Sequence, residues 1–231
     1  MKNLNRVTSI RLMLVTYAMA CSIYIAKSQE YNQSMDLIKE LHISNKVRSS
    51  FTVPQKPEDI NPLRKGRKIP TANLVTSSGE LFNVSKAVAE KPTILIVYRG
   101  GWCPYCTKQL SGLQNALPEL EKLGYQLIAV STDAPDELMK SVAKEKLNYT
   151  LLSDADLSLS KQLGIAYKAP KAYWEMLTKT SDGKNVEMLL PVPSVFILDT
   201  TGTIQFEYIN PDFRERLNTT LLKAAAASIK K

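Results

Sequence analysis

Two cysteines with two residues between them stand where a strand pattern changes into a helix pattern, in the run Trp-Cys-Pro-Tyr-Cys at residues 102–106. The preceding run, residues 93–98, is short, apolar and β-branched, which predicts a buried strand. Residues 109–114 carry the pattern of a helix. A thiol at the start of a helix lies near unpaired backbone N–H groups, and these groups favour the thiolate. The junction therefore predicts a fold that presents Cys103 and Cys106 for redox chemistry.

Other uses of a close cysteine pair have less support in this sequence. A disulfide across so short a loop stabilises a fold very little, so a structural bridge is a poor explanation. A zinc site needs two further ligands, and the single histidine, His42, stands far upstream, which also argues against a Cys–His protease. No metal site is expected. A binding module that holds copper or zinc through Cys103 and Cys106 stays open as a non-enzymatic alternative.

The N-terminal segment has the pattern of an export signal. Three basic residues lie within the first eleven positions, an apolar stretch of fifteen residues follows at 12–26, and small residues then offer a cleavage site. Since a helix needs about 20 residues to span a bilayer, the stretch is short for a membrane anchor. We expect a cleaved signal peptide at residues 1–28, whose removal takes away Cys21, and a secreted or periplasmic protein. An uncleaved membrane anchor is the alternative.

The 231-residue chain has the composition of a folded globular protein, with 44% hydrophobic and 23% charged residues. Its net charge of +8 is scattered without a run of five basic residues, so no nucleic-acid partner is expected. Residues 29–65 hold a helical pattern followed by a proline-rich and basic connector. We expect the redox domain to occupy residues 66–231.

The expected redox domain alternates between strand and helix patterns. Strands are expected at 72–75, 80–82, 93–98, 126–132, 148–152, 195–199 and 203–208. Helices are expected from a Ser85 cap to residue 90, from the cysteines to residue 123 with a kink or restart at Pro118, and at 136–146, 157–163 and 212–227. Residues 165–190 are expected to form an insertion, and Asp133 and Asp199 to be cap or turn residues. The alternation predicts an α/β domain with a mixed central sheet, a closing antiparallel hairpin and a C-terminal helix.

Three segments resemble a known family. Residues 98–106, with the helix pattern after them, are similar to the peroxiredoxin-like branch of the alkyl hydroperoxide reductase / thiol-specific antioxidant family. Residues 193–202 resemble the closing hairpin of that family, and residues 206–213 resemble its last strand and the start of its last helix. The similarity covers about residues 66–229 and implies a thioredoxin-like fold, in agreement with the alternation of elements.

The resemblance implies a thiol-dependent peroxidase that reduces hydrogen peroxide and organic hydroperoxides without a bound cofactor. In that chemistry a thiolate becomes a sulfenic acid, and a second thiol condenses with it, here as a disulfide between Cys103 and Cys106. A thioredoxin-like protein would restore the dithiol by exchange. The alternative is an extracytoplasmic thiol-disulfide oxidoreductase that acts on protein cysteines. The sequence does not set the oligomeric state.

The resemblance leaves open which thiol attacks peroxide. In the family pattern Pro-x-x-x-Thr-x-x-Cys, Cys106 takes the place of the cysteine, Cys103 that of the threonine and Arg99 that of the proline. The position at the helix start instead favours Cys103 as the thiol that initiates disulfide exchange. Both cysteines are therefore expected to be catalytic.

The sequence departs from the family where an arginine is expected near the closing strand. Residues 192–194 read Val-Pro-Ser instead, which resembles the cis-proline loop of thioredoxins. We expect a cis bond before Pro193 that places backbone groups beside the sulfurs for pairing with a partner strand. Arg99 is either a cationic substitute for the missing arginine or a surface charge. Trp102 either shields the thiols or packs in the core.

Overall fold

The computed structural model describes residues 53–229 and the isolated positions 27, 29, 33 and 35. The predicted signal peptide and the helical pattern after it fall almost entirely outside these residues, and His42 lies outside them too. The compact unit begins at Val53. In this described part, no helix is long and apolar enough to cross a membrane.

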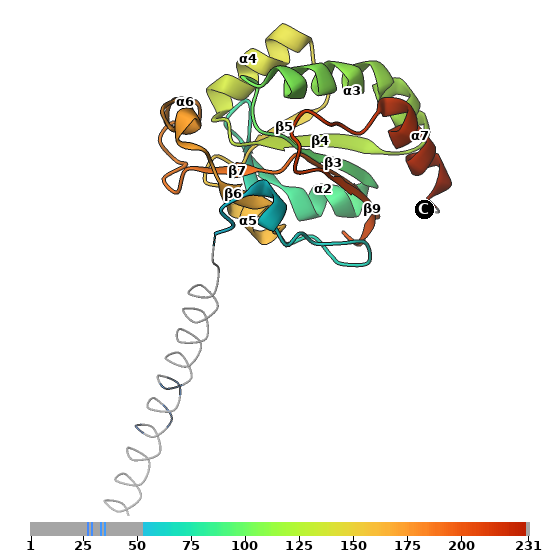
Figure 1. Cartoon of the computed structure of the whole chain (residues 1–231). Helices are drawn as coiled ribbons and strands as arrows, with labels where there is room; N and C mark the ends of the chain where they lie inside the picture. Colours follow the sequence, from blue (N-terminus) through green and yellow to red (C-terminus); the bar gives the residue numbers. More distant parts are fainter. Residues whose placement is uncertain (1–26, 28, 30–32, 34, 36–52, 230–231) are drawn as a thin grey trace, which may run out of the picture. The chain divides into compact units, whose positions relative to one another are not determined.

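A seven-stranded mixed sheet forms the centre of the compact unit, in the order β2-β1-β5-β4-β3-β8-β9 (Figure 1). Its strands are β1 (Asn73–Thr76), β2 (Leu81–Asn83), β3 (Thr93–Val97), β4 (Gln126–Ser131), β5 (Thr150–Ser153), β8 (Ser194–Leu198) and β9 (Ile204–Ile209). The strands β3, β4 and β5 run parallel, and β8 pairs antiparallel with β3. Hairpins β1–β2 and β8–β9 form the two edges. The predicted mixed sheet and its two hairpins are confirmed.

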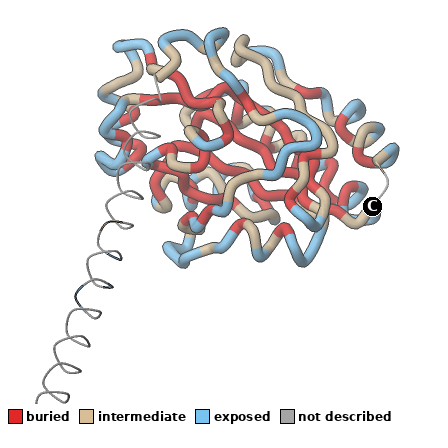
Figure 2. The backbone as a smooth tube through the Cα atoms, turned by 90° about the horizontal axis from the view of Figure 1, so that it is seen from below, coloured by how far each residue is buried: buried red, intermediate tan, exposed pale blue. Residues whose placement is uncertain are grey.

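Helices cover both faces of the sheet, which explains the uninterrupted apolar run in β3. Ile94 and Ile96 join the core beneath three helices, and Leu95 and Val97 join the core against two others. The first face carries α3 (Pro104–Lys122), α4 (Pro135–Glu145) and α7 (Thr219–Ser228), and the second carries α2 (Val84–Glu90) and α5 (Ser158–Gln162) (Figure 1). Buried backbone accordingly runs through the middle of the unit, with exposed residues on the outer turns (Figure 2).

The helix that follows the cysteines continues as one element through Pro118. The predicted restart at this residue is wrong, because a buried face that includes Leu113, Leu117 and Leu120 holds the helix against the core. Proline removes one backbone donor, and packing of this face outweighs that loss.

Two helix starts differ from the sequence-based prediction. Ser85 lies inside α2, because Asn83 caps this helix by accepting a 2.7 Å hydrogen bond from the backbone N–H of Lys86. The last helix begins at Thr219 rather than near Asp212. Asp212 instead accepts hydrogen bonds from the backbone and side chain of Arg214, which holds the chain in a turn. The irregular segment 210–218 is thereby available to contact the first turn of α3.

The expected insertion at residues 165–190 forms a small layer of its own. It contains β6 (Ala166–Lys168), η2 (Lys171–Tyr173), α6 (Trp174–Thr180) and β7 (Leu189–Pro191). The strands β6 and β7 pair antiparallel, and their core includes Val192 and packs against Trp102. On another side, the connector contributes the short turn η1 (Pro57–Asp59), and Pro54 accepts a backbone hydrogen bond from Lys168. The division of the chain at residues 28 and 65 stays a prediction.

Candidate thiol site

Both cysteines lie in the first turn of α3, at the point where β3 delivers the chain from the sheet. Cys103 is the N-cap, with extended backbone, and Pro104 is the first helical residue, where its missing N–H costs nothing. The hydroxyl of Thr107 donates to the carbonyl of Gly101 at 3.1 Å and so fastens the preceding loop to this turn. Cys103 and Cys106 are free thiols, and their exposed fractions are 1% and 0%. The predicted strand-to-helix junction is confirmed.

Contact between the two thiols gives them different acidities. The pKa of Cys103 is lowered to about 6, chiefly by a hydrogen bond from the Cys106 thiol, then by the Cys106 amide and by the charges of Arg99 and Arg216. Burial raises the pKa of Cys106 well above its usual value, and the hydrogen bond to Cys103 raises it further. The reduced pair therefore carries its negative charge on Cys103.

Arg99 is a buried cation in a cage of three aromatic rings. Its guanidinium carbon lies 4.9 Å from the ring centroid of Trp102, 4.7 Å from that of Tyr173 and 4.2 Å from that of Phe213. The side chain is only 2% exposed, its Nε has no hydrogen-bond partner, and within the described residues it forms no ion pair. The surface-charge interpretation of Arg99 is therefore wrong. A buried cation without a carboxylate favours a nearby thiolate, which agrees with its effect on Cys103.

Replacing Arg99 with methionine should separate thiol reactivity from stability. Loss of the positive charge moves the pH midpoint for alkylation of Cys103 about one pH unit upward, so the rate at pH 6 falls roughly fivefold. The free energy of unfolding stays equal or rises, because an apolar side chain avoids the cost of a buried unpaired charge. Iodoacetamide profiles read by mass spectrometry and urea unfolding measure the two effects. Arg214→Met is the control, and an unchanged midpoint in Arg99→Met would rule out the electrostatic role.

A second arginine reaches the site from the segment between β9 and α7. Nη2 of Arg216 donates a hydrogen bond to Sγ of Cys106 at 3.3 Å, and its Nε and Nη1 are buried without a partner. The sequence did not predict this contact, although it correctly showed no arginine near the closing strand. The expected place near the closing strand is indeed occupied by Val192-Pro193-Ser194, and the arginine comes from the next segment of the chain instead.

A buried carboxyl group holds the loop before the cysteines. Oδ2 of Asp133, at the end of β4, accepts the backbone N–H of Gly101 at 2.7 Å, and Oδ1 has no partner. Burial raises the pKa of this carboxyl to about 7. Gly100 has φ +155, and a Cβ atom here would overlap Asp133 Oδ1 and the indole nitrogen of Trp102. The loop is therefore fitted closely around Asp133, which is neither a simple cap nor a turn residue.

Pro193 lies buried directly before β8, whose first residue pairs with Val97 at the end of β3. The described residues contain no cis peptide bond, so the predicted cis bond before Pro193 is wrong. The neighbouring backbone is already paired in the trans form, because Val192 donates to the carbonyl of Ile165 at 2.8 Å and the hydroxyl of Ser194 donates to Val192. Trans is also the intrinsically favoured form of a bond to proline. Pro193 thus stays near the site without the thioredoxin-like geometry.

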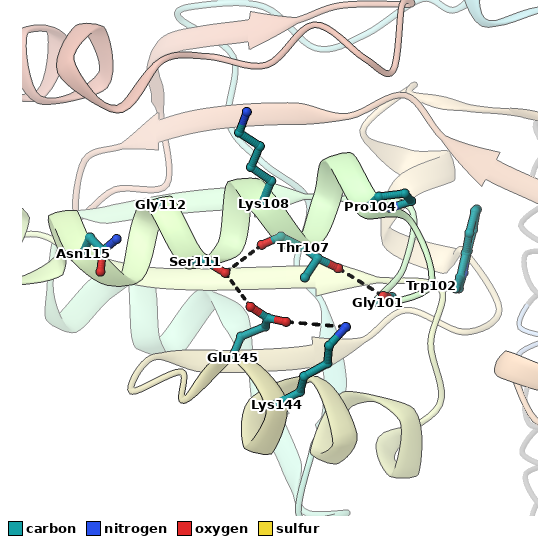
Figure 3. Close-up of a pocket in the computed structure, with 10 residues that line it drawn as sticks. All are labelled: Gly101, Trp102, Pro104, Thr107, Lys108, Ser111, Gly112, Asn115, Lys144 and Glu145. Carbon is teal, nitrogen blue, oxygen red and sulfur yellow. Dashed lines mark hydrogen bonds and ion pairs between the residues drawn. The ribbon is translucent and has the colours of Figure 1, made fainter.

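A groove of about 690 Å³ runs between α3 and α4 and reaches the cysteine loop at Gly101, Trp102 and Pro104 (Figure 3). Glu145 from α4 lines the groove and accepts a hydrogen bond from the hydroxyl of Ser111 in α3 at 2.6 Å. Trp102 is half-buried, and it lines this groove while stacking on Tyr173. Trp102 also packs against the core cluster that contains both cysteines and against the insertion, which agrees with the core-packing interpretation, while its shielding of the thiols stays a prediction.

The described residues offer little to a metal ion. No group of three or more histidine, cysteine, aspartate or glutamate side chains gathers in residues 53–229. Within this part, the guanidinium groups of Arg99 and Arg216 lie near the cysteine pair, and their positive charges oppose the binding of a metal cation. The arrangement suits the chemistry of a thiolate instead.

Comparison with known proteins agrees with this arrangement. Residues 65–207 match the model of the AhpC/TSA family. The chain is 31% identical over 155 residues to Peroxiredoxin Bcp of Escherichia coli (strain K12), across 67% of this chain and 90% of that protein.

Two solved structures share the fold at lower identity. Peroxidoxin BcpB from Mycobacterium tuberculosis has a TM-score of 0.59 and 18% identity, across 73% of this chain and 99% of that one. A yeast mitochondrial 1-Cys peroxiredoxin, solved to explain how its thiol is resolved via glutathione/thioredoxin systems, has a TM-score of 0.55 and 17% identity, across 70% and 73%. The predicted thioredoxin-like fold is confirmed.

Proposed function

The chain belongs to the AhpC/TSA family and is a thiol-dependent peroxidase, and we propose that Cys103 attacks the peroxide while Cys106 resolves the product. The observation that carries this proposal is the distribution of charge in the reduced pair. The pKa of Cys103 is lowered to about 6, whereas burial raises that of Cys106. A thiolate is the reactive form of cysteine, so the more acidic thiol reacts first.

The surroundings of Cys103 support the same assignment. Its neighbours Trp102 and Pro104 line the groove between α3 and α4, so this groove ends beside the residue that carries the thiol. Arg99 keeps a positive charge close by in a dry aromatic cage, where electrostatic attraction is stronger than in water. Cys106 lies deeper, and its protonated thiol donates a hydrogen bond to Cys103.

The proposed reaction has three steps. The Cys103 thiolate forms a bond to one peroxide oxygen as the O–O bond breaks, and Cys103 becomes a sulfenic acid. The other oxygen departs as an alkoxide or hydroxide and takes up a proton to give the alcohol or water. Cys106 then forms the disulfide with Cys103, and its proton leaves with the sulfenic hydroxyl as water. A dithiol donor finally reduces the disulfide by exchange.

We propose a thioredoxin-like protein as that donor. The support is the vicinal arrangement of the thiols and the yeast relative whose thiol is resolved via glutathione/thioredoxin systems. The proposed location is extracytoplasmic, on the strength of the charge and hydropathy pattern of residues 1–28. Hydrogen peroxide and organic hydroperoxides are the proposed substrates.

A stoichiometric reaction of the reduced wild-type protein tests this function. One mole of protein should consume one mole of hydrogen peroxide and then stop, and its mass should fall by two hydrogens as the disulfide forms. A thioredoxin, thioredoxin reductase and NADPH should then restore turnover. Peroxide assays and intact-mass spectrometry give both readouts.

The same preparation separates the alternative function. A thiol-disulfide oxidoreductase would reduce insulin disulfides and leave the peroxide concentration unchanged. That outcome would refute the peroxidase proposal and favour action on protein cysteines instead.

A further inference from the structure

Arg216 places an uncompensated positive charge against the deeper of the two thiols. Its Nη2 donates to Sγ of Cys106 at 3.3 Å, across 110 residues of sequence. Its Nε and Nη1 are buried without partners, and within residues 53–229 it forms no ion pair. Its charge therefore acts on both thiols: it favours the Cys103 thiolate of the reduced pair, and it lies in direct contact with Cys106, the sulfur on which the next anion must develop.

Cys106 needs such help after the first step and not before it. While Cys103 is a thiolate, Cys106 stays protonated and donates a hydrogen bond to it. Once Cys103 has become a sulfenic acid, Cys106 must lose its proton in a fully buried position, where desolvation opposes a negative charge. Among the groups that lower the pKa of Cys106, the charge of Arg216 has the largest effect.

We propose that Arg216 is a catalytic residue of the resolving step, in which it stabilises the Cys106 thiolate as the disulfide forms. The inference rests on the proposed function of Cys103. In this step the S–S bond forms and the S–O bond of the sulfenic acid breaks. The proton of Cys106 and the sulfenic hydroxyl leave together as water. The oxidation state of the sulfenic acid is shared between the two sulfurs of the disulfide, so atoms and electrons balance without a further reactant.

The same contact acts in reverse during regeneration. When the dithiol donor attacks Cys103, the sulfur of Cys106 leaves as a thiolate, and a low-pKa leaving thiol speeds exchange. Arg216 thus stabilises the same charged form of Cys106 in closing and in opening the disulfide.

Arg99, which is buried, and Arg216, which is half-buried, contact the thiol site in different ways. Arg99 sits in its aromatic cage and favours the Cys103 thiolate, whereas Arg216 hydrogen-bonds to Cys106. A cavity of about 430 Å³, lined by Tyr105, Gln109 and Arg216 among others, opens beside α3 on the Arg216 side. Oε1 of Gln109 is also buried without a partner.

Single-turnover kinetics of Arg216→Met test the proposal. Reduced protein is mixed with hydrogen peroxide and quenched at intervals, and mass spectrometry counts thiol, sulfenic acid and disulfide. Disulfide formation should slow roughly tenfold or more, because an opposite charge in contact lowers the pKa of a thiol by about one unit or more. Sulfenic acid at Cys103 should accumulate. At pH 8, where Cys103 is largely a thiolate with or without the charge of Arg216, peroxide consumption should stay within about twofold of wild type. Arg216→Lys should recover part of the rate, since it keeps the charge but loses the planar guanidinium.

Arg214→Met is the matched control, because Arg214 lies two residues away, is exposed and pairs with Asp212 at 2.8 Å. It should behave as wild type in both steps. If Arg216→Met slows peroxide consumption instead, or forms the disulfide at the wild-type rate, the proposal is wrong. Should Arg216→Met not fold, Arg216→Gln, which keeps a polar side chain but carries no charge, decides between the same outcomes. Absence of sulfenic acid at Cys103 in Cys106→Ser would instead contradict the proposed function, whatever Arg216 does.

Discussion

Cys103→Ser is expected to consume peroxide no faster than buffer, whereas Cys106→Ser should reduce one equivalent and stop as a stable sulfenic acid on Cys103. A serine hydroxyl remains protonated near neutral pH and is no nucleophile towards peroxide. Removing Cys106 takes away the resolving thiol but leaves the helix start and Arg99 around Cys103. A selective sulfenic-acid probe and peptide mass spectrometry identify the modified residue.

The rate of the first step should depend on whether residue 106 can still donate a hydrogen bond to Cys103. The serine hydroxyl in Cys106→Ser still donates to the Cys103 sulfur, so the first step should slow by less than about tenfold. Cys106→Ala removes that donor and should slow the first step further. Urea unfolding of each variant serves as the stability control, because both positions are fully buried.

The opposite labelling pattern would assign the roles the other way. Sulfenic acid trapped on Cys106 in Cys103→Ser would mean that the residue in register with the family cysteine attacks the peroxide, with Arg216 beside it. The lowered pKa of Cys103 would then serve disulfide exchange with the donor alone. The experiment therefore separates two mechanisms that share every residue of the site.

The sequence predicted the part of the site that local patterns encode. The apolar run of β3, the helix pattern of α3 and the spacing of Cys103 and Cys106 all concern residues that are close along the chain. Strand-to-helix junctions of this kind follow from period and turn chemistry, so the positions of both thiols were foreseeable. The two closing strands were foreseeable for the same reason.

The electrostatic part of the site depends on contacts between distant segments, which hydrophobic periodicity does not encode. Tyr173 and Phe213 reach Arg99 from the insertion and from the segment after β9, and Arg216 reaches Cys106 from that segment too. A signal did exist: Arg216 follows Asn-Pro-Asp, a turn-forming run that was assigned to the start of a helix. Reading that run as a turn would have left Arg216 free to approach the first turn of α3.

Asp133 shows why a buried polar residue is hard to recognise in a sequence. Aspartate at a strand end is usually a cap or a turn residue, and both are exposed roles. Here its oxygen binds the amide of Gly101, 32 residues earlier, and the side chain is almost fully buried. Only the parallel pairing of β3 with β4 brings these two strand ends together.

The stability advantage of Asp133→Asn over wild type should grow as the pH rises and reach about 4 kcal/mol above pH 7. The pKa of Asp133 is raised by burial from 3.8 to about 7 in the folded protein. Between these values the unfolded chain has lost the proton and the folded chain keeps it. Wild-type stability therefore falls by up to about 1.4 kcal/mol per pH unit over this window, and the loss is complete above pH 7. Asparagine stays neutral and can still accept the amide of Gly101.

Urea unfolding of both reduced proteins between pH 4 and pH 8 measures this difference. The two free energies of unfolding should agree to within about 1 kcal/mol near pH 4, diverge steadily and run parallel above pH 7. Asp136→Asn is the control, since Asp136 is exposed at the start of α4 only three residues away. A difference between wild type and Asp133→Asn that does not change with pH would show that Asp133 is ionised throughout. The loop before Cys103 would then be held by a buried carboxylate, and the nearby Lys140 and Lys144 would have to supply the balancing charge.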